Sequence, residues 1–153
     1  MLRESDIELI YELCQGNKIY YQYHPPFVTR ENIKADMYAL PPNKSMEDKF
    51  YIGFFDGEQL VAVMDLIMHF PSEKVAMIGF FMVSVNVQKR GVGSKIIEEM
   101  MNALKASGFE LCRLAIDQGN PQSEAFWLKN QFVLTGECIP NDFSAYLPLT
   151  RQL

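Results

Sequence analysis

Three apolar runs stand out in the middle of the chain, at residues 50–55, 60–70 and 75–85. Asp56-Gly57 separates the first two runs and is typical of a hairpin turn, and residues 71–74 separate the second two. Connections this short join antiparallel strands. The pattern therefore predicts a three-stranded antiparallel meander.

Helical spacing of apolar residues appears on both sides of this meander. Residues 5–14 and 29–37 each place their apolar positions on one face, with Ser5 and Thr29 as expected N-caps. The tyrosine-rich segment 16–28 between them is either a second helical turn packed on the core or a wall of a substrate pocket. A longer helix follows the meander, because apolar residues recur there at spacings of three and four: Ile96, Ile97, Met100, Met101 and Leu104.

The last third of the chain alternates between the two kinds of pattern. It predicts a strand at 111–116, a short helix at 123–129 and two further strands at 132–139 and 143–149. The predicted order is ααβββαβαββ. This order indicates an α/β (α+β) fold with a mixed, mostly antiparallel sheet, in a single domain over residues 1–153.

Composition excludes several classes of protein. A length of 153 residues, 48% of them hydrophobic, suits one domain with its own core. The net charge of −5 argues against a nucleic-acid surface. The three cysteines form no C-x-x-C pair, so reduced thiols are expected and no metal site. No run approaches a membrane span and the N-terminus has no signal-peptide core, so we expect a cytoplasmic protein without a membrane partner.

The segment between the third strand and the long helix has the features of an anion site. Its glycines, Gly91 and Gly93, allow the backbone to turn tightly and to approach a ligand. The first N–H groups of a helix lack internal partners and favour negative charge, which Lys89 and Arg90 reinforce. The dinucleotide fingerprint fails because Ile96 stands where it needs a third glycine, and the P-loop spacing is absent.

The Q-x-x-G-x-G spacing of this loop resembles the pyrophosphate loop of the GNAT superfamily of acyl-CoA-dependent N-acyltransferases. A second segment, Asn120 to Phe132 (NPQSEAFWLKNQF), is similar to the family pattern of Asn, a small residue, an aromatic pair, Lys, Gly and Phe. The predicted order of elements also looks like the GNAT fold. The resemblance is specific over Val75–Phe132 and only topological over residues 1–74.

The resemblance implies an N-acetyltransferase. Such an enzyme moves an acetyl group from acetyl-CoA onto a primary amine of a small molecule or peptide, by direct attack in a ternary complex and without a metal. The Phe81 N–H would polarise the thioester carbonyl, and the backbone from Met82 to Val83 would pair with pantetheine. Asn120 and Phe126 would line the pantetheine arm. Seven loop residues would surround the pyrophosphate: Gln88, Lys89, Arg90, Gly91, Val92, Gly93 and Ser94.

Three positions depart from the family pattern. Val85 stands where a proline is common, and Gln131 where a glycine is common. Trp127 replaces a tyrosine that can protonate the departing thiolate. Indole is only a hydrogen-bond donor and has no proton that titrates in the useful range, so Trp127 cannot act as that acid.

The group that deprotonates the amine is not evident either. The family often uses a glutamate on the third strand, but the residues on the corresponding alternating face do not titrate: Met77, Gly79 and Phe81. Asp65 on the neighbouring strand is the first candidate for a base, followed by His69 and Tyr146. A relay of water to bulk solvent is the remaining alternative.

Two other functions remain open on the sequence. A non-catalytic acyl-CoA sensor on the same fold would explain the absent tyrosine and glutamate. An α/β interaction module would need both motifs to be accidental. Residues 16–49 and the turn at 70–74 should shape the acceptor pocket, but composition does not name the amine. The oligomeric state is also open, with a homodimer as one possibility.

Overall fold

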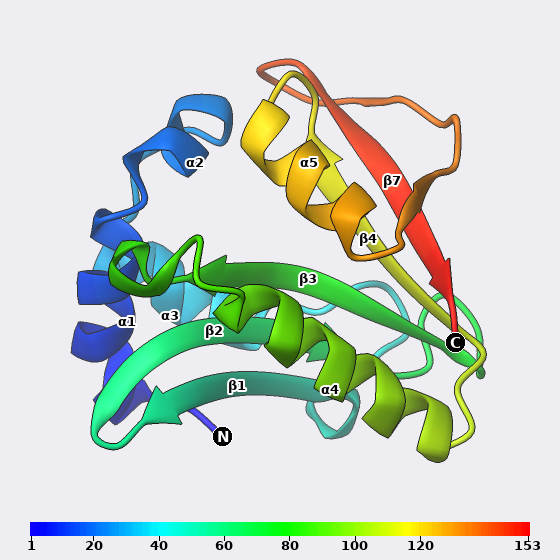
Figure 1. Cartoon of the computed structure of the whole chain (residues 1–153), viewed down its shortest axis with the longest axis horizontal. Coiled ribbons are helices and arrows are strands. Elements are labelled where there is room, and N and C mark those ends of the chain that lie inside the picture. Colours follow the sequence, from blue (N-terminus) through cyan, green and yellow to red (C-terminus); the bar gives the residue numbers. More distant parts are fainter.

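The computed structural model describes all 153 residues (Figure 1). Three helices come first: α1 (Ile7–Gln15), α2 (Lys18–Tyr23) and α3 (Arg30–Tyr38). The meander follows: β1 (Lys49–Asp56), β2 (Gln59–Ile67) and β3 (Val75–Val83). The remaining elements are α4 (Val92–Ala106), β4 (Leu111–Asp117), α5 (Pro121–Lys129), β5 (Val133–Leu134), β6 (Ile139–Pro140) and β7 (Ala145–Gln152). None of these helices is long and apolar enough to cross a membrane.

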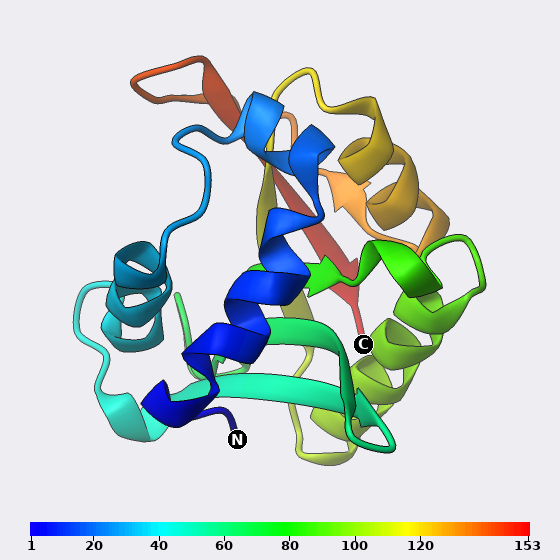
Figure 2. The ribbon, with the colours of Figure 1, turned by 90° about the vertical axis from the view of Figure 1, so that its left-hand side faces the viewer.

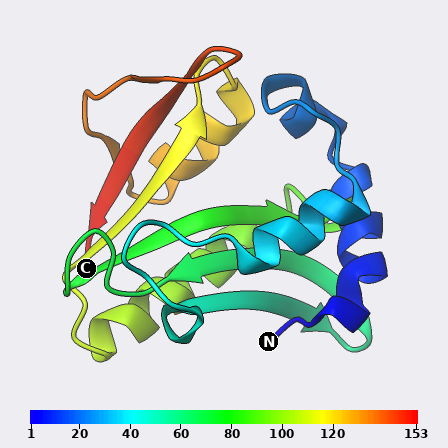
Figure 3. The same cartoon turned by 180° about the vertical axis from the view of Figure 1, so that it is seen from behind.

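The strands form one sheet in the order β1-β2-β3-β4-β7-β5, with β6 also paired to β7. Every pair is antiparallel except β3 with β4. That parallel pair is held only where Val75–Met77 meets Leu111–Arg113, and beyond it the strands diverge (Figures 1 and 3). The divergence leaves an opening in the middle of the sheet, flanked by residues 78–83 of β3 and 114–117 of β4.

Helices cover the sheet on both faces, so the protein has two hydrophobic clusters. Helices α4 and α5 cover one face, and Figures 2 and 3 show α1 and α3 on the other face of β1 to β3. The buried residues of the α4/α5 side include Met64, Ile78, Ile97, Leu104, Leu114 and Trp127. Those of the α1/α3 side include Ile10, Leu13, Ile33, Tyr51, Val63 and Met82. The predicted helical faces therefore supply the core.

A β-bulge at Gly79 changes which residues of β3 share a face. Asp65 pairs with Phe80 while Leu66 pairs with Ile78, so Gly79 has no partner on β2. A Cβ atom at Gly79 would lie 2.8 Å from Oδ2 of Asp65, which leaves room only for glycine. After the bulge Phe81 packs on the same cluster as Ile78. The expectation that Met77 and Phe81 share a face is therefore wrong.

Local side-chain hydrogen bonds explain where several element boundaries differ from prediction. Thr29 caps α3 as expected, accepting from the Asn32 N–H at 3.1 Å. The first helix begins after a 3₁₀ turn, in which the Arg3 N–H donates to Asp6, and Ser5 does not cap it.

The C-terminal strands also differ. The strand predicted at 132–139 is two short strands, since Gly136 adopts φ 87 between them. The last strand begins at Ala145, because the Asn141 side chain accepts from the N–H groups of Phe143 and Ser144 and holds a turn there.

Candidate active site

Two adjoining cavities occupy the opening between β3 and β4. The first has a volume of about 350 Å³ and lies against the N-terminus of α4 and one side of α5. The second has a volume of about 300 Å³ and lies between the separated strands. Four residues line both cavities: Tyr20, Phe81, Ser123 and Trp127. The two cavities thus meet at Phe81 and Trp127, in the centre of the sheet.

The glycine loop presents free backbone donors to the first cavity. Gly91 is the N-cap residue of α4 and has φ 78, a left-handed conformation that glycine adopts readily. No side chain caps the helix, so its first N–H groups lack partners within the protein. Beyond Gly91, its chain neighbours and the adjoining helix backbone, no heavy atom lies within 4 Å of the position that a Cβ at Gly91 would occupy. This end of the helix therefore has both the donors and the space for an anion.

Gly93 has a different role, in packing. It is buried, and a Cβ there would lie 3.1 Å from the Phe126 ring and 3.2 Å from Val83. The missing side chain allows α4 to approach both α5 and the end of β3. The second glycine of the motif therefore allows the N-terminus of α4 to pack closely against Phe126 and Val83, which line the first cavity.

The edge of β3 that faces the opening has unpaired backbone groups. The Ser84 N–H donates to the Val61 carbonyl on the β2 side at 2.8 Å. Because hydrogen bonds alternate along an antiparallel strand, Phe81 and Val83 direct their backbone groups away from β2. Strand β4 pairs only as far as Met77, so these groups face the cavities without a strand partner. An extended ligand can be added here as a strand.

One of these groups is already occupied by side chains. The Val83 carbonyl accepts from Nε2 of Gln88 at 2.8 Å and from Nδ2 of Asn17 at 3.3 Å. Gln88 also donates to Oδ1 of Asn17 at 2.7 Å. Both Gln88 amide hydrogens thus tie the loop to β3 and to Asn17, which lies between α1 and α2. The sequence analysis missed Asn17 and expected the Gln88 side chain beside the pyrophosphate.

The remaining predicted residues divide into those that reach the first cavity and those that do not. Lys89, Ser94, Asn120 and Phe126 line it, whereas Arg90 and Val92 do not. Asn120 is buried and caps α5, accepting from the Ser123 N–H at 3.2 Å. The only charged residues that line the first cavity are Lys89 and Lys129. Their positive charge suits an anionic ligand.

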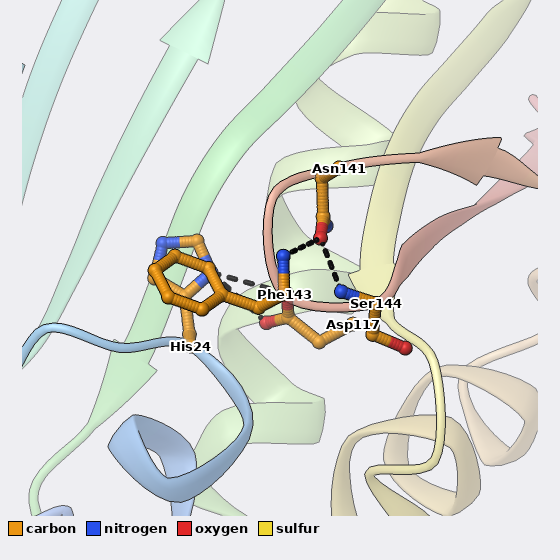
Figure 4. A network of polar contacts seen from close by, with 5 residues as sticks. All are labelled: His24, Asp117, Asn141, Phe143 and Ser144. Carbon is orange, nitrogen blue, oxygen red and sulfur yellow. Dashed lines mark hydrogen bonds and ion pairs between the residues drawn. The ribbon is translucent and has the colours of Figure 1, made fainter.

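The second cavity contains a hydrogen-bonded histidine–carboxylate pair that the sequence analysis missed. Nδ1 of His24 lies 3.1 Å from both carboxylate oxygens of Asp117 (Figure 4). Hydrogen bonding to this carboxylate raises the pKa of His24, against the opposing effect of burial. Asp117 is buried at the end of β4, while the His24 side chain is 39% exposed. These are the only charged or titratable groups of the lining besides Tyr20 and Tyr146.

Asp65, the first candidate for a base, lies outside both cavities. Its carboxylate accepts from Nζ of Lys49 at 2.9 Å, on the face of the sheet that α1 and α3 cover. Burial raises the pKa of Asp65, and Lys49 opposes this shift. Oδ1 of Asp65 is the only buried side-chain polar atom without a hydrogen-bond partner. This arrangement favours a structural role for Asp65.

The other two candidates lie at opposite ends of the opening. His69 packs on Phe109 and bonds to the Glu73 carbonyl, at the end where β3 and β4 are still paired. It lines neither cavity. Tyr146 lines the second cavity, where its ring centroid is 6.4 Å from that of His24. Burial and the nearby Asp117 raise the pKa of Tyr146, which disfavours its phenolate form.

Trp127 forms the partition between the cavities. It is buried in an aromatic group, with ring centroids 5.0 Å from Phe126, 5.0 Å from Phe132 and 5.9 Å from Phe81. The indole N–H donates to no protein atom, yet it is not among the buried unpaired polar atoms. It is therefore open to the cavities that Trp127 lines.

A family model described as the acetyltransferase (GNAT) family matches residues 11–132. The match contains the glycine loop, the open edge of β3, the His24–Asp117 pair and the whole of α5. No curated protein sequence matches the chain at a significant level.

Solved structures share the fold over nearly the whole chain. An acetyltransferase from Thermus thermophilus is 17% identical with a TM-score of 0.79, over 99% of this chain and 94% of that one. The PaiA N-acetyltransferase from Thermoplasma acidophilum, in complex with coenzyme A, is 18% identical with a TM-score of 0.72, over 99% and 96%. The ribosomal-protein-S18-alanine N-acetyltransferase from Escherichia coli is 13% identical with a TM-score of 0.69, over 99% and 90%.

Proposed function

The chain belongs to the acetyltransferase (GNAT) family, and we propose that it is an N-acetyltransferase that uses acetyl-CoA to acetylate a primary amine of a small molecule or peptide. One observation carries the proposal. A cavity whose only charges are positive adjoins a cavity that contains a buried carboxylate, and the two meet beside Phe81. The first suits the phosphates of CoA, and the second suits a cationic amine.

The residues around the first cavity fit acetyl-CoA. The uncapped end of α4 and the open space in front of Gly91 would receive the pyrophosphate. Lys89 and Lys129 add positive charge there. The Val83 N–H would donate to the pantetheine arm. The Val83 carbonyl already accepts from Gln88 and therefore does not accept from that arm. When bound, acetyl-CoA supplies the activated acetyl group.

The chain itself contributes position and electrostatics more than covalent chemistry. The Phe81 N–H faces the junction of the cavities and would donate to the thioester oxygen as negative charge develops on it. The acceptor would bind beside that junction, in contact with three residues that line the second cavity: Tyr20, Phe80 and Tyr146. Orientation of two bound partners is the main source of rate enhancement in such a ternary complex.

An acceptor screen tests this function. Purified protein is mixed with acetyl-CoA and a panel of primary amines and N-terminal peptides, and release of free CoA thiol is followed. We expect thiol release that depends on the amine for at least one member of the panel. Binding of acetyl-CoA without turnover on any amine would favour the acyl-CoA sensor, which Trp127 in place of a tyrosine supports. Absence of binding would contradict both.

We expect Trp127→Phe to retain turnover within about tenfold of the wild type, a limit of roughly 1.4 kcal/mol in activation free energy. Indole cannot supply a proton to the thiolate, so its loss should affect packing more than chemistry. Trp127→Tyr should keep or raise kcat. Initial rates at saturating acetyl-CoA measure both variants. A larger fall in kcat for Trp127→Phe at unchanged acetyl-CoA affinity would show that the indole N–H contributes to the reaction.

A further inference from the structure

We propose that His24, held in one tautomer by Asp117, is the base that removes the proton from the acceptor ammonium group. This inference rests on the proposed function and identifies the proton acceptor for it. His24 lines the second cavity together with Phe81 and Trp127, where the acceptor would meet the acyl donor. Asp117 acts through His24 and is therefore a positioning residue.

The geometry of the pair determines which ring nitrogen is free. Nδ1 of His24 lies 3.1 Å from Oδ1 and 3.1 Å from Oδ2 of Asp117. A carboxylate accepts hydrogen bonds, so Nδ1 of the neutral ring carries the hydrogen. Nε2 then has the lone pair, and it makes no hydrogen bond within the protein. A histidine whose one nitrogen is fixed by a buried carboxylate and whose other is free is organised to accept a proton.

The groups around His24 favour its acting at neutral to mildly alkaline pH. Asp117 on β4, hydrogen-bonded to the ring, raises the pKa of His24, and the more distant carboxylate of Asp36 on α3 adds to this shift. The rings of Tyr20 on α2 and Tyr146 on β7 lie tilted beside the His24 ring, and both are uncharged at these pH values, since burial raises the pKa of each. An ordinary histidine titrates near pH 6.5, so the base form of His24 should appear above that value.

The protons balance in the following way. Neutral His24 takes one proton from the ammonium group, and the amine nitrogen then bonds to the thioester carbon. The oxygen gains negative charge beside the Phe81 N–H. The carbon–sulfur bond breaks, the nitrogen loses its second proton to the departing sulfur, and CoA leaves as the thiol. Protonated His24, 39% of whose side chain is exposed, returns its proton to water.

The central test compares His24→Asn with His69→Asn. Asparagine can place its amide N–H near Nδ1 and keep the hydrogen bond to Asp117, but it cannot take up a proton. We expect His24→Asn to lower kcat/KM for the amine by on the order of 10²-fold at neutral pH, while the thermal shift caused by acetyl-CoA persists. His69 is the only other histidine and lines neither cavity, so His69→Asn should match the wild type.

The pH dependence separates a base from a structural role. For the wild type, kcat/KM for the amine should rise through the pKa of His24 and then level off. For His24→Asn with an alkyl amine as the acceptor, kcat/KM should keep rising tenfold per pH unit towards the amine pKa near 10.4, since only free amine then reacts. Asp117→Asn should shift the rising part of the kcat/KM profile to lower pH than in the wild type. A His24→Asn profile that follows the wild type, with an unchanged rate, would overturn the role of His24 and leave the acetyltransferase function standing.

A second readout does not depend on activity. The Cε1–H resonances of the two histidines are followed by NMR through a pH titration and assigned from the two asparagine variants. We expect the midpoint of the His24 titration to lie above the ordinary histidine pKa near 6.5. In Asp117→Asn this midpoint should move to lower pH. Identical titration of His24 in the two proteins would contradict the pairing on which the inference depends. If the wild type acetylates no amine, the function fails and the inference fails with it.

Discussion

Replacing Gly91 with aspartate should abolish the rise in melting temperature that acetyl-CoA gives the wild type. A ligand that binds only the folded protein stabilises it by RT ln(1 + [L]/Kd), so loss of the shift reports loss of binding. The aspartate would place a side chain and a negative charge in the open space before the helix N-terminus. At a ligand concentration of 100 Kd the wild-type stabilisation is about 2.7 kcal/mol, which a thermal melt detects readily.

Gly57→Asp provides the matched control. Gly57 also has a positive φ, 60°, and open space around its missing Cβ, but it lies in the hairpin turn between β1 and β2. Both substitutions carry the same cost of placing aspartate in a left-handed conformation. We expect Gly57→Asp to keep the full shift caused by acetyl-CoA. A Gly91→Asp protein with the full shift would show that the pyrophosphate binds elsewhere.

Replacing Lys49 with methionine should destabilise the protein strongly without removing a catalytic group. The Lys49 side chain is 1% exposed, and its Nζ donates to Asp65 at 2.9 Å and to the Ala39 carbonyl at 2.8 Å. The variant leaves the Asp65 carboxylate buried with no cation. Breaking a buried pair in this way costs about 3–5 kcal/mol, and each kcal/mol lowers the melting temperature of a chain this long by roughly 2–4 °C.

The pH dependence of Lys49→Met has a defined sign. Removing the cation should raise the pKa of Asp65 further, because burial and the negative charge of Asp36 both raise it and Lys49 no longer opposes them. Protonation then removes the buried charge, so the stability lost relative to the wild type should be smaller at about pH 5 than at about pH 8. Chemical denaturation at the two values measures this. An equal loss at both would show that the Asp65 charge is not the cause.

Asp65→Asn distinguishes the structural role of Asp65 from the catalytic one. We expect this variant also to be destabilised, because Lys49 loses its partner, while kcat/KM for the amine stays close to the wild-type value. A fall of on the order of 10²-fold or more in kcat/KM, with acetyl-CoA affinity retained, would restore Asp65 as the base. The amine assay and the denaturation curve are measured on the same preparation.

The regular elements were predictable because their signals are local. The meander follows from three apolar runs and two turns, and the end of α4 in the first cavity follows from the Gln88–Ser94 loop. The faces of β3 were predicted less well, because alternation was counted through Gly79 as though the strand were regular. An isolated glycine inside a strand is a signal for a bulge. That signal was present in the sequence and could have corrected the position of Phe81.

The His24–Asp117 pair could not have been predicted from local sequence patterns. The two residues are 93 positions apart and meet only because β3 and β4 diverge while α2 lies over the opening. Asn17, which holds Gln88, is 71 positions from it. Neither contact belongs to a spaced motif. The tyrosine-rich segment was predicted either as a helical turn packed on the core or as a pocket wall, and both descriptions apply. Helix α2 forms there with Tyr20 and Tyr21 packed against the α1/α3 cluster, and Tyr20 also lines both cavities. That outcome also depends on long-range packing.

Mass spectrometry of one complete reaction tests direct transfer between bound partners. The protein is incubated with acetyl-CoA and the best acceptor from the screen. The masses of the amine, the CoA and the intact protein are then measured in the same sample, and the small molecules are quantified. Direct attack in a ternary complex predicts acetylated amine and free CoA in equal amounts, with the protein mass unchanged. An acetyl group attached to the protein in the absence of amine, or free CoA without acetylated amine, would contradict it.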